Sequence, residues 1–255
     1  MKGGISVAVV KTDVTAAVRF LFSGWEETIL WSCLEGTMGA VYTIEGKKTI
    51  SAVAILGDFR FFAGQPNREL LDWNSQPSSI LIPKDTQWEQ LMQEVYKDKA
   101  TRGVRYAIRK EPNVFNLEQL RLAADSLPCG YSLQFIDQQI YTLCLQNEWS
   151  RDLVSQYHNY SHYQAHGLGI AVLTEGQLVA GASSYSTYPG GIEIEIDTQK
   201  EYRRRGLAYA CGARLILECL SRELYPSWDA QNKESVALAE KLGYHFDREY
   251  PVFLL

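Results

Sequence analysis

The first regular pattern along the chain is helical. Apolar residues recur every three or four positions through about five turns, at positions 14, 18, 21, 22, 25, 29 and 33. Such spacing places them on one face of a helix. We therefore predict a single helix from Asp13 to Cys33, which Gly36 ends.

Strand patterns dominate the rest of the first half. The runs rich in β-branched and aromatic residues are 38–44, 49–56, 58–63, 79–82 and 104–108. The turn 45–48 joins the first two runs into a predicted hairpin. Thr86 and Glu89 have the spacing of a capping box, which predicts a helix from there to about Tyr96.

A break near residue 130 divides the chain. Asn116 can cap a short helix with Gln119 at the reciprocal position, and Leu127-Pro128-Cys129-Gly130 then interrupts the pattern. We predict two domains, an N-terminal α/β domain over 1–130 and a second domain over 131–255.

The second half alternates strands and helices, the order of an α/β fold. Its predicted strands are 131–137, 169–173, 178–185, 191–198, 227–230 and 244–255, and its helical stretches are 138–164, 206–222 and 233–242. The strand 191–198 alternates strictly. Isoleucines at 192, 194 and 196 share one face, and Glu193, Glu195 and Asp197 share the other.

Composition and charge exclude several classes of protein. A net charge of −5 disfavours a nucleic-acid binder, which usually has a basic excess, and it suits a cationic substrate. No run approaches the roughly 20 apolar residues of a membrane span. The apolar run 5–10 is too short for a signal-peptide core, and the five cysteines contain no Cys-x-x-Cys pair. We expect a cytoplasmic protein without a membrane or nucleic-acid partner.

The segment from Arg203 to Ala208 carries the strongest chemical signal. It opens the predicted helix 206–222, where the first backbone amides have no intrahelical partner and the helix dipole is positive. Three arginines are unfavourable there unless an anion occupies the turn. Gly206 would let a phosphate oxygen approach the backbone. The pattern predicts an anion site, with a solvated basic run as the alternative.

This segment resembles the signature of the GNAT superfamily of acetyl-CoA-dependent N-acetyltransferases. The signature, Arg/Gln-x-x-Gly-x-Gly/Ala, stands here as Arg203-x-x-Gly206-x-Ala208 after the strand 192–198. Asn232-x-x-Ser235, followed by Leu242-Gly243-Tyr244, resembles the family's fifth strand and fourth helix. The resemblance covers about 131–255. It implies a mixed-sheet α/β acetyltransferase that uses acetyl-CoA and no metal.

The resemblance also implies roles for single residues. Backbone amides of the turn would bind the cofactor pyrophosphate, the end of the strand would pair with the pantetheine arm, and one side chain would contact that arm. The cofactor-binding residues expected on this basis are Ile196, Thr198, Arg203, Arg204, Arg205, Gly206, Leu207, Ala208 and Asn232.

An amine must lose a proton before it attacks, so a general base is expected. Glu193 and Glu195 are the candidates, although they could instead line a solvated surface or bind the substrate ammonium. Asp229 is a weaker candidate. Ala239 stands where many GNAT enzymes place a tyrosine that protonates the leaving thiolate. Either no dedicated acid exists or another group such as Tyr244 serves, although an aromatic residue there is more often part of the core.

Further phrases resemble the branch of the superfamily that contains the zwittermicin A resistance acetyltransferase. They are 192–198, 225–230, 20–25 and 149–152. This resemblance implies transfer to a primary amine of a small molecule by direct attack in a ternary complex, and it suggests antibiotic modification. The alternative is a non-catalytic acyl-CoA-binding sensor, which the missing tyrosine favours.

The first domain and a row of three histidines each suggest a hypothesis. The predicted elements of the first domain loosely repeat those of the second, with Ala63-Gly64-Gln65-Pro66-Asn67 at the place of the phosphate loop. We expect a degenerate GNAT-like half that shapes the acceptor site. His158, His162 and His166 would share a helix face, but no carboxylate or cysteine joins them at helical spacing, so we expect no metal there.

Overall fold

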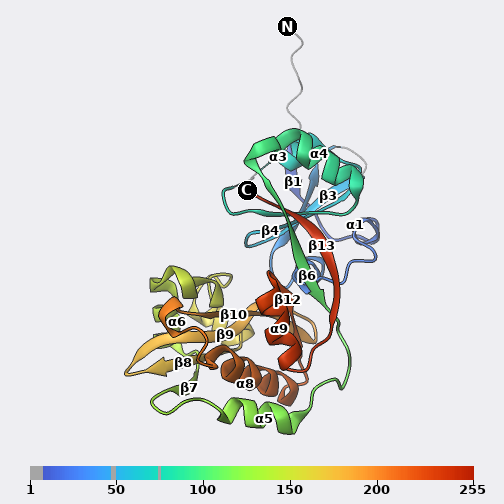
Figure 1. Ribbon diagram of the computed structural model, residues 1–255. Coiled ribbons are helices and arrows are strands. Elements are labelled where there is room, and N and C mark those ends of the chain that lie inside the picture. The colour runs from blue at the N-terminus through green and yellow to red at the C-terminus, as the bar shows by residue number, and fades with distance from the viewer. Residues whose placement is uncertain (1–7, 47–49, 74–75) are drawn as a thin grey trace. The chain divides into compact units, whose positions relative to one another are not determined.

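The computed structural model describes residues 8–46, 50–73 and 76–255 (Figure 1). The chain forms two compact units: residues up to Arg105 together with Glu249–Leu255, and Tyr106–Arg248. The structure thus divides earlier than the predicted boundary near residue 130. The reason is the helix α5 (Leu117–Asp125), which packs against α8 (Leu207–Ser221) and shares its core.

The first unit is built on one sheet. Its strands are β1 (Val9–Lys11), β2 (Ala40–Ile44), β3 (Ser51–Leu56), β4 (Phe59–Gly64), β5 (Ile80–Pro83), the first part of β6 (Thr101–Ile108) and the last part of β13 (Phe246–Leu254). The strand order is β1-β2-β3-β4-β5-β13-β6. Its helices are α1 (Ala16–Leu21), α2 (Thr28–Leu34), α3 (Arg68–Asp72) and α4 (Thr86–Tyr96), followed by the short η1 (Lys97–Lys99).

The strand predictions for this unit are confirmed, but two helix predictions are wrong in detail. The predicted helix 13–33 is two helices, because Gly24 between them has a left-handed φ of 76° that a continuing helix cannot use. Helix α4 is capped by Asp85 rather than by Thr86. The Asp85 carboxylate accepts hydrogen bonds from the amides of Gln87 and Trp88. The predicted turn 45–48 lies partly outside the described residues.

The second unit contains a five-stranded sheet in the order β11-β10-β9-β8-β7. Its strands are β7 (Ser132–Phe135), β8 (Gly169–Thr174), β9 (Gln177–Tyr188), β10 (Gly191–Thr198) and β11 (Tyr225–Ser227), with the short β12 (Asp229–Ala230) pairing with the end of β6. Besides α5 and α8, its helical segments are α6 (Gln138–Gln146), η2 (Glu148–Leu153), α7 (Tyr160–His166), η3 (Lys200–Tyr202) and α9 (Lys233–Lys241). The predicted strand 227–230 is therefore two short strands in different ladders.

The two units repeat one order of strands and α-helices. In each, two helices follow the first strand, three antiparallel strands come next, and a helix then leads to a strand parallel to the one before it. A further helix, α4 or α9, and a last strand, β6 or β13, complete the set. The loose repeat expected from the sequence is thus present in the topology.

Helix α8 and segment η2 lie against the sheet of the second unit. Isoleucines 192 and 194 of β10 share a core cluster with Leu207, Cys211 and Leu215 of α8. Segment η2 packs against β9 and β10. A Cβ atom on Gly181 of β9 would approach the Leu153 side chain of η2 to 2.6 Å, so the glycine lets this side chain pack close to the strand.

Strand β10 parts from β11 half-way along its length. Residues Gly191–Glu193 pair in parallel with Tyr225–Ser227, whereas β10 continues to Thr198 paired only with β9. The ladder between β9 and β10 also shifts register between Glu193 and Ile194. The next strand, β12, pairs with β6 and not with β10. Among the described residues, one backbone edge of 194–198 therefore has no strand partner.

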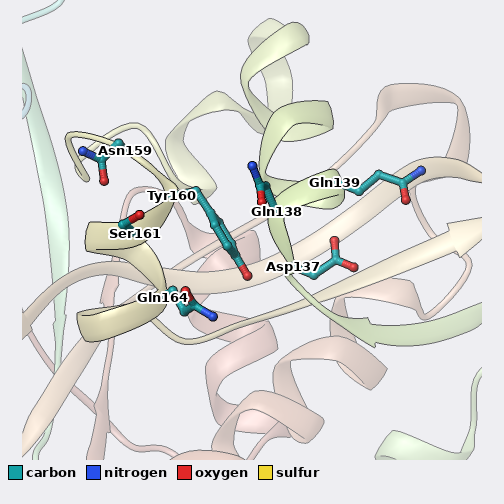
Figure 2. A pocket seen from close by; sticks show the side chains of 7 residues that line it. All are labelled: Asp137, Gln138, Gln139, Asn159, Tyr160, Ser161 and Gln164. Carbon is teal, nitrogen blue, oxygen red and sulfur yellow. The ribbon is translucent and has the colours of Figure 1, made fainter.

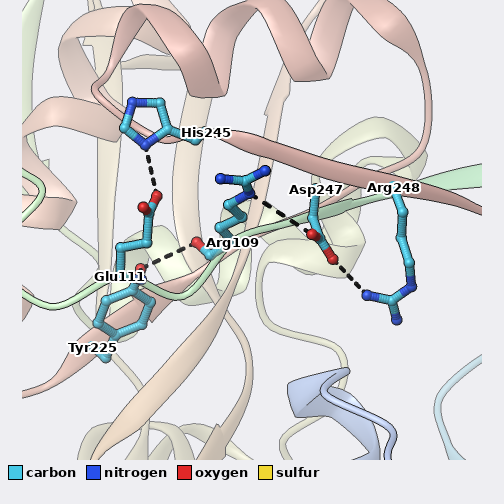
Figure 3. Close-up of polar contacts among 6 residues, drawn as sticks. All are labelled: Arg109, Glu111, Tyr225, His245, Asp247 and Arg248. Atoms are coloured by element: carbon cyan, nitrogen blue, oxygen red, sulfur yellow. Dashed lines mark hydrogen bonds and ion pairs between the residues drawn. The ribbon is translucent and has the colours of Figure 1, made fainter.

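Polar contacts hold the two ends of the second unit's chain together (Figure 3). His245 Nδ1 lies 2.6 Å from Glu111 Oε2, and the Glu111 amide donates to the Tyr225 hydroxyl at 2.9 Å. Arg109 and Asp247 form a looser ion pair at 3.8 Å. These groups are partly exposed, so such pairs contribute little to stability.

No helix among the described residues is both long and apolar enough to span a membrane.

Leu120→Ala and Leu122→Ala form a matched pair on α5. Leu120 is 2% exposed in the shared core and Leu122 is 66% exposed. We expect Leu120→Ala to cost about 2–5 kcal/mol of unfolding free energy and Leu122→Ala about 0.5 kcal/mol or less. Urea denaturation measures both. Equal losses would mean that α5 does not belong to this core.

Candidate active site

The acidic face of β10 lies at the point where the strands part. Glu193 is only 3% exposed and sits opposite Ser186 of β9 and Ser227 of β11. Glu195 is half-buried and sits opposite Ser183. Because directly paired residues share a sheet face, both carboxylates lie among serine side chains. The expected alternative of a solvated acidic surface is therefore wrong for Glu193.

Tyr188, which the sequence did not single out, lies on the same face. Its hydroxyl is 2.7 Å from that of Ser227, and a side chain at Gly191 would collide with its ring. Burial raises the pKa of Tyr188, the Ser227 hydrogen bond lowers it, and the charge of Glu193 raises it further. The hydroxyl thus stays protonated beside a buried carboxylate. Its only sequence signal is its place before the Pro189-Gly190 turn.

Arg203 ties the end of β10 to the loop that follows. Its Nε donates to the Thr198 carbonyl at 3.0 Å, and its terminal nitrogen lies 3.4 Å from Asp197. Burial raises the pKa of Asp197, whereas the Thr198 amide and Arg203 lower it and Asp152 raises it. The Arg203 side chain therefore positions this loop.

The next two arginines differ from each other. Arg205 donates to the Tyr131 hydroxyl at 2.9 Å and to the Glu201 carbonyl at 3.0 Å, and it stacks over Tyr202. Arg204 is exposed, has a left-handed φ of 62°, and makes no side-chain hydrogen bond or ion pair to any described residue. Of the three guanidinium groups, the one on Arg204 is open to an external anion.

The first turn of α8 also lacks a cap. Gly206 occupies the N-cap position with a φ of 80°, and no side chain bonds to the amides that follow. The other four α-helices of this fully described unit are capped by side chains, namely Asn116, Asp137, Asn159 and Asn232. Across the described chain, no acceptor is found for the amides of 204–209. Such amides at a helix N-terminus are suited to an anion.

The remaining predicted site residues lie on β10, β12 and α9. Ile196 and Thr198 lie on the half of β10 beyond β11. Asn232 caps α9, where its Oδ1 accepts from the Ser235 amide at 2.8 Å and its Nδ2 remains a donor. Ala239 is fully buried on α9, and half-buried Asp229 lies on β12.

Tyr244 belongs to the core. It is 2% exposed, packs against Phe115 and Trp228, and donates to the Pro226 carbonyl at 2.7 Å. Burial raises its pKa far above the usual range. This placement agrees with the core assignment rather than with an acid role.

The three histidine rings lie in a row, with His158 stacked on His162 and His166 edge to face with His162. Their ring centroids are 5.3 Å apart for His158 and His162 and 5.0 Å apart for His162 and His166. Burial lowers the pKa of His162, and both neighbours lower it further. The part of the chain that the structure describes contains no group of three or more His, Cys, Asp or Glu side chains able to hold a metal ion.

The sequence matches one family of enzymes over nearly the whole chain. A sequence model described as GNAT acetyltransferase matches residues 19–253. The chain belongs to the GNAT acetyltransferase family. This acetyltransferase is 29% identical over 244 residues to the uncharacterized N-acetyltransferase YdfB of Bacillus subtilis (strain 168), with 89% of each protein covered.

Solved structures agree with this family. A GCN5-related N-acetyltransferase-like protein from Streptococcus suis 89/1591 superposes with a TM-score of 0.91 at 46% identity, covering 93% of this GNAT chain and 96% of the other. A tandem GNAT protein from the clavulanic acid biosynthesis pathway shares the fold alone. It has a TM-score of 0.52 at 12% identity, with 97% of each chain covered.

Proposed function

We propose that this enzyme transfers the acetyl group of acetyl-CoA to a primary amine of a small molecule, by direct attack in a ternary complex. One observation carries the proposal. The uncapped turn at Gly206 follows the half of β10 that β11 leaves unpaired, with η3 between them. A phosphate-binding turn and an open strand edge are the two features that a phosphorylated pantetheine arm requires.

The cofactor would occupy this turn and this edge. The amides of 204–208 would hold the pyrophosphate, helped by the Arg204 guanidinium, while Arg203 and Arg205 keep the loop in place. The backbone of Ile196 and Thr198 would pair with the pantetheine arm, and Asn232 Nδ2 could donate to it. A free amide at the parting point would stabilise the oxyanion of the thioester carbonyl.

Glu193 is the proposed general base. Its carboxylate is buried at the parting point, where the thioester would arrive, and Glu195 lies farther along the same face. The base takes a proton from the substrate ammonium, and the amine nitrogen then attacks the carbonyl carbon. The carbon–sulfur bond breaks, and the thiolate accepts a proton. Glu195 is better placed to hold the ammonium group before transfer.

Tyr188 is the proposed donor of that last proton. Ala239 cannot supply one, and the Tyr244 hydroxyl already donates to Pro226 inside the core. The Tyr188 hydroxyl lies on the acidic face, 2.7 Å from Ser227. A phenol held protonated beside the breaking bond can protonate a thiolate.

We further propose that the first unit is a degenerate GNAT-like half that shapes the acceptor site. Its element order repeats that of the second unit, and the tandem GNAT protein named above offers a precedent for the architecture. In this half Asn67 caps α3, accepting from the Leu70 amide at 2.9 Å, so the corresponding turn is closed by the protein itself. The resemblance to the zwittermicin A resistance branch supports a small amine as acceptor. We also propose that the enzyme works in the cytoplasm.

Arg204→Glu should weaken acetyl-CoA binding roughly 10–100-fold, because it replaces one charge-assisted contact with repulsion. Isothermal titration calorimetry measures the Kd. Arg121→Glu, an exposed arginine on α5, is the control for net charge and should bind as the parent does. Equal weakening by both variants would contradict the pyrophosphate assignment.

Glu193→Gln should lower kcat about 10²–10⁴-fold without changing the Kd of acetyl-CoA. Release of free thiol with a panel of amines measures the rate against pH. In the parent, protonation of the base makes the rate fall toward acid pH, and the variant should lack this fall. A larger loss in Glu195→Gln would transfer the base role to Glu195. Acetyl-CoA binding without thiol release from any amine would favour an acyl-CoA sensor.

Tyr188→Phe and Tyr244→Phe each remove one hydroxyl. Tyr188→Phe should lower kcat while acetyl-CoA still binds. Tyr244→Phe should lower the unfolding free energy by about 1–3 kcal/mol, because the Pro226 carbonyl loses its donor, without a comparable fall in kcat. Thermal unfolding and thiol release separate the two effects. An unchanged kcat in Tyr188→Phe would remove it as the acid.

A further inference from the structure

The second unit has a polar depression lined by residues of α6, α7 and the positions just before them. It measures about 750 Å³ and opens between the first turns of α6, which follows β7, and α7. Its lining contains none of the residues placed in the candidate active site. The depression is therefore a separate set of side chains, and a ligand there does not depend on acetyl transfer.

The lining is dense in carboxamides. Gln138 and Gln139 come from α6, and Gln164 comes from α7 (Figure 2). None of these three side chains hydrogen-bonds to a described residue, so each offers one acceptor and two donor hydrogens. Asn159 caps α7 through Oδ1, 2.9 Å from the His162 amide, and keeps its Nδ2 as a donor. Such groups match neighbouring hydroxyls, which also donate and accept.

One aromatic ring lies between the two helices. Figure 2 shows Tyr160 projecting between the side chains of α7 and those of α6. Its ring meets Tyr141 edge to face at 5.6 Å, and Tyr141 is itself buried. The ring is therefore held in place before any ligand binds. Its negatively polarised face suits the C–H groups of a saturated ring.

Charge selects among saturated polyhydroxylated ligands. Asp137 is the one ionisable carboxylate in the lining, and it faces no lysine or arginine there. Its Oδ1 accepts from the Ile140 amide at 2.9 Å, which leaves Oδ2 for a ligand. The site therefore disfavours acids and favours an amine. We propose that this depression binds a hexose unit, with an amino sugar preferred to a neutral one and a sugar acid bound least well.

The test is an NMR titration of the ¹⁵N-labelled full chain with glucosamine, glucose and glucuronate. Side-chain amide signals of Gln138, Gln164 and Asn159 report directly on the lining. We expect saturable shifts of these signals, with affinity falling in the order named. Glucosamine should bind about 2–5 times more tightly than glucose, the size of one exposed charge contact. The absence of saturable shifts in these signals would overturn the proposal.

Three variants sharpen the test. Asp137→Asn keeps an oxygen that caps α6 but removes the charge, so it should abolish the preference for glucosamine over glucose. The double variant Gln138→Ala, Gln164→Ala should weaken both sugars by about tenfold or more. His166→Ala, on α7 but outside the lining, should keep the parent Kd. Parent-like binding by the double variant would place the sugar elsewhere and overturn the proposal.

Discussion

The parting of β10 from β11 after Glu193 is the constraint on which the second unit depends. A strand can leave one edge unpaired only if its other edge is held, and β9 holds β10 along its full length. The open backbone groups must find partners in water or in a ligand. The same parting encloses Glu193 among serines and directs the chain into the turn that starts α8. The same strand thus carries a buried carboxylate at the parting point and an open edge beyond it, and the uncapped helix follows later in the chain.

The two halves of the chain use the same turn in opposite ways. In the first, Asn67 caps α3 by accepting from the Leu70 amide, and Glu69 lies in the first turn, where its charge offsets the helix dipole. In the second, Gly206 has no side chain to cap α8, and no acidic residue lies in the first turn of that helix. The α3 turn thus has a side-chain cap, whereas the corresponding turn of α8 has none.

Local patterns in the sequence predicted most of the second unit. The alternation of 191–198, the Gly206 turn and the Asn116 cap each depend on neighbours within a few residues, and the structure has all three. Tertiary partners were not predictable in this way. The partners of Arg203 and Arg205, namely the Thr198 carbonyl and the Tyr131 hydroxyl, are set by folding. Tyr188 gains its place on the acidic face only through the β9–β10 pairing. The packing of Leu120 against the core that α8 shares has no local signature either.

The interior position of β13 in the first sheet has a consequence for biosynthesis. Phe253 and Leu254 pair with Leu81 and Ile80 of β5, and β6 lies on the other side of β13. A ribosome makes β5 and β6 long before it makes the strand that separates them. A nascent chain that has emerged only as far as α9 holds a first sheet with a missing interior strand. Completion of the first sheet must therefore wait until β13 has been synthesised.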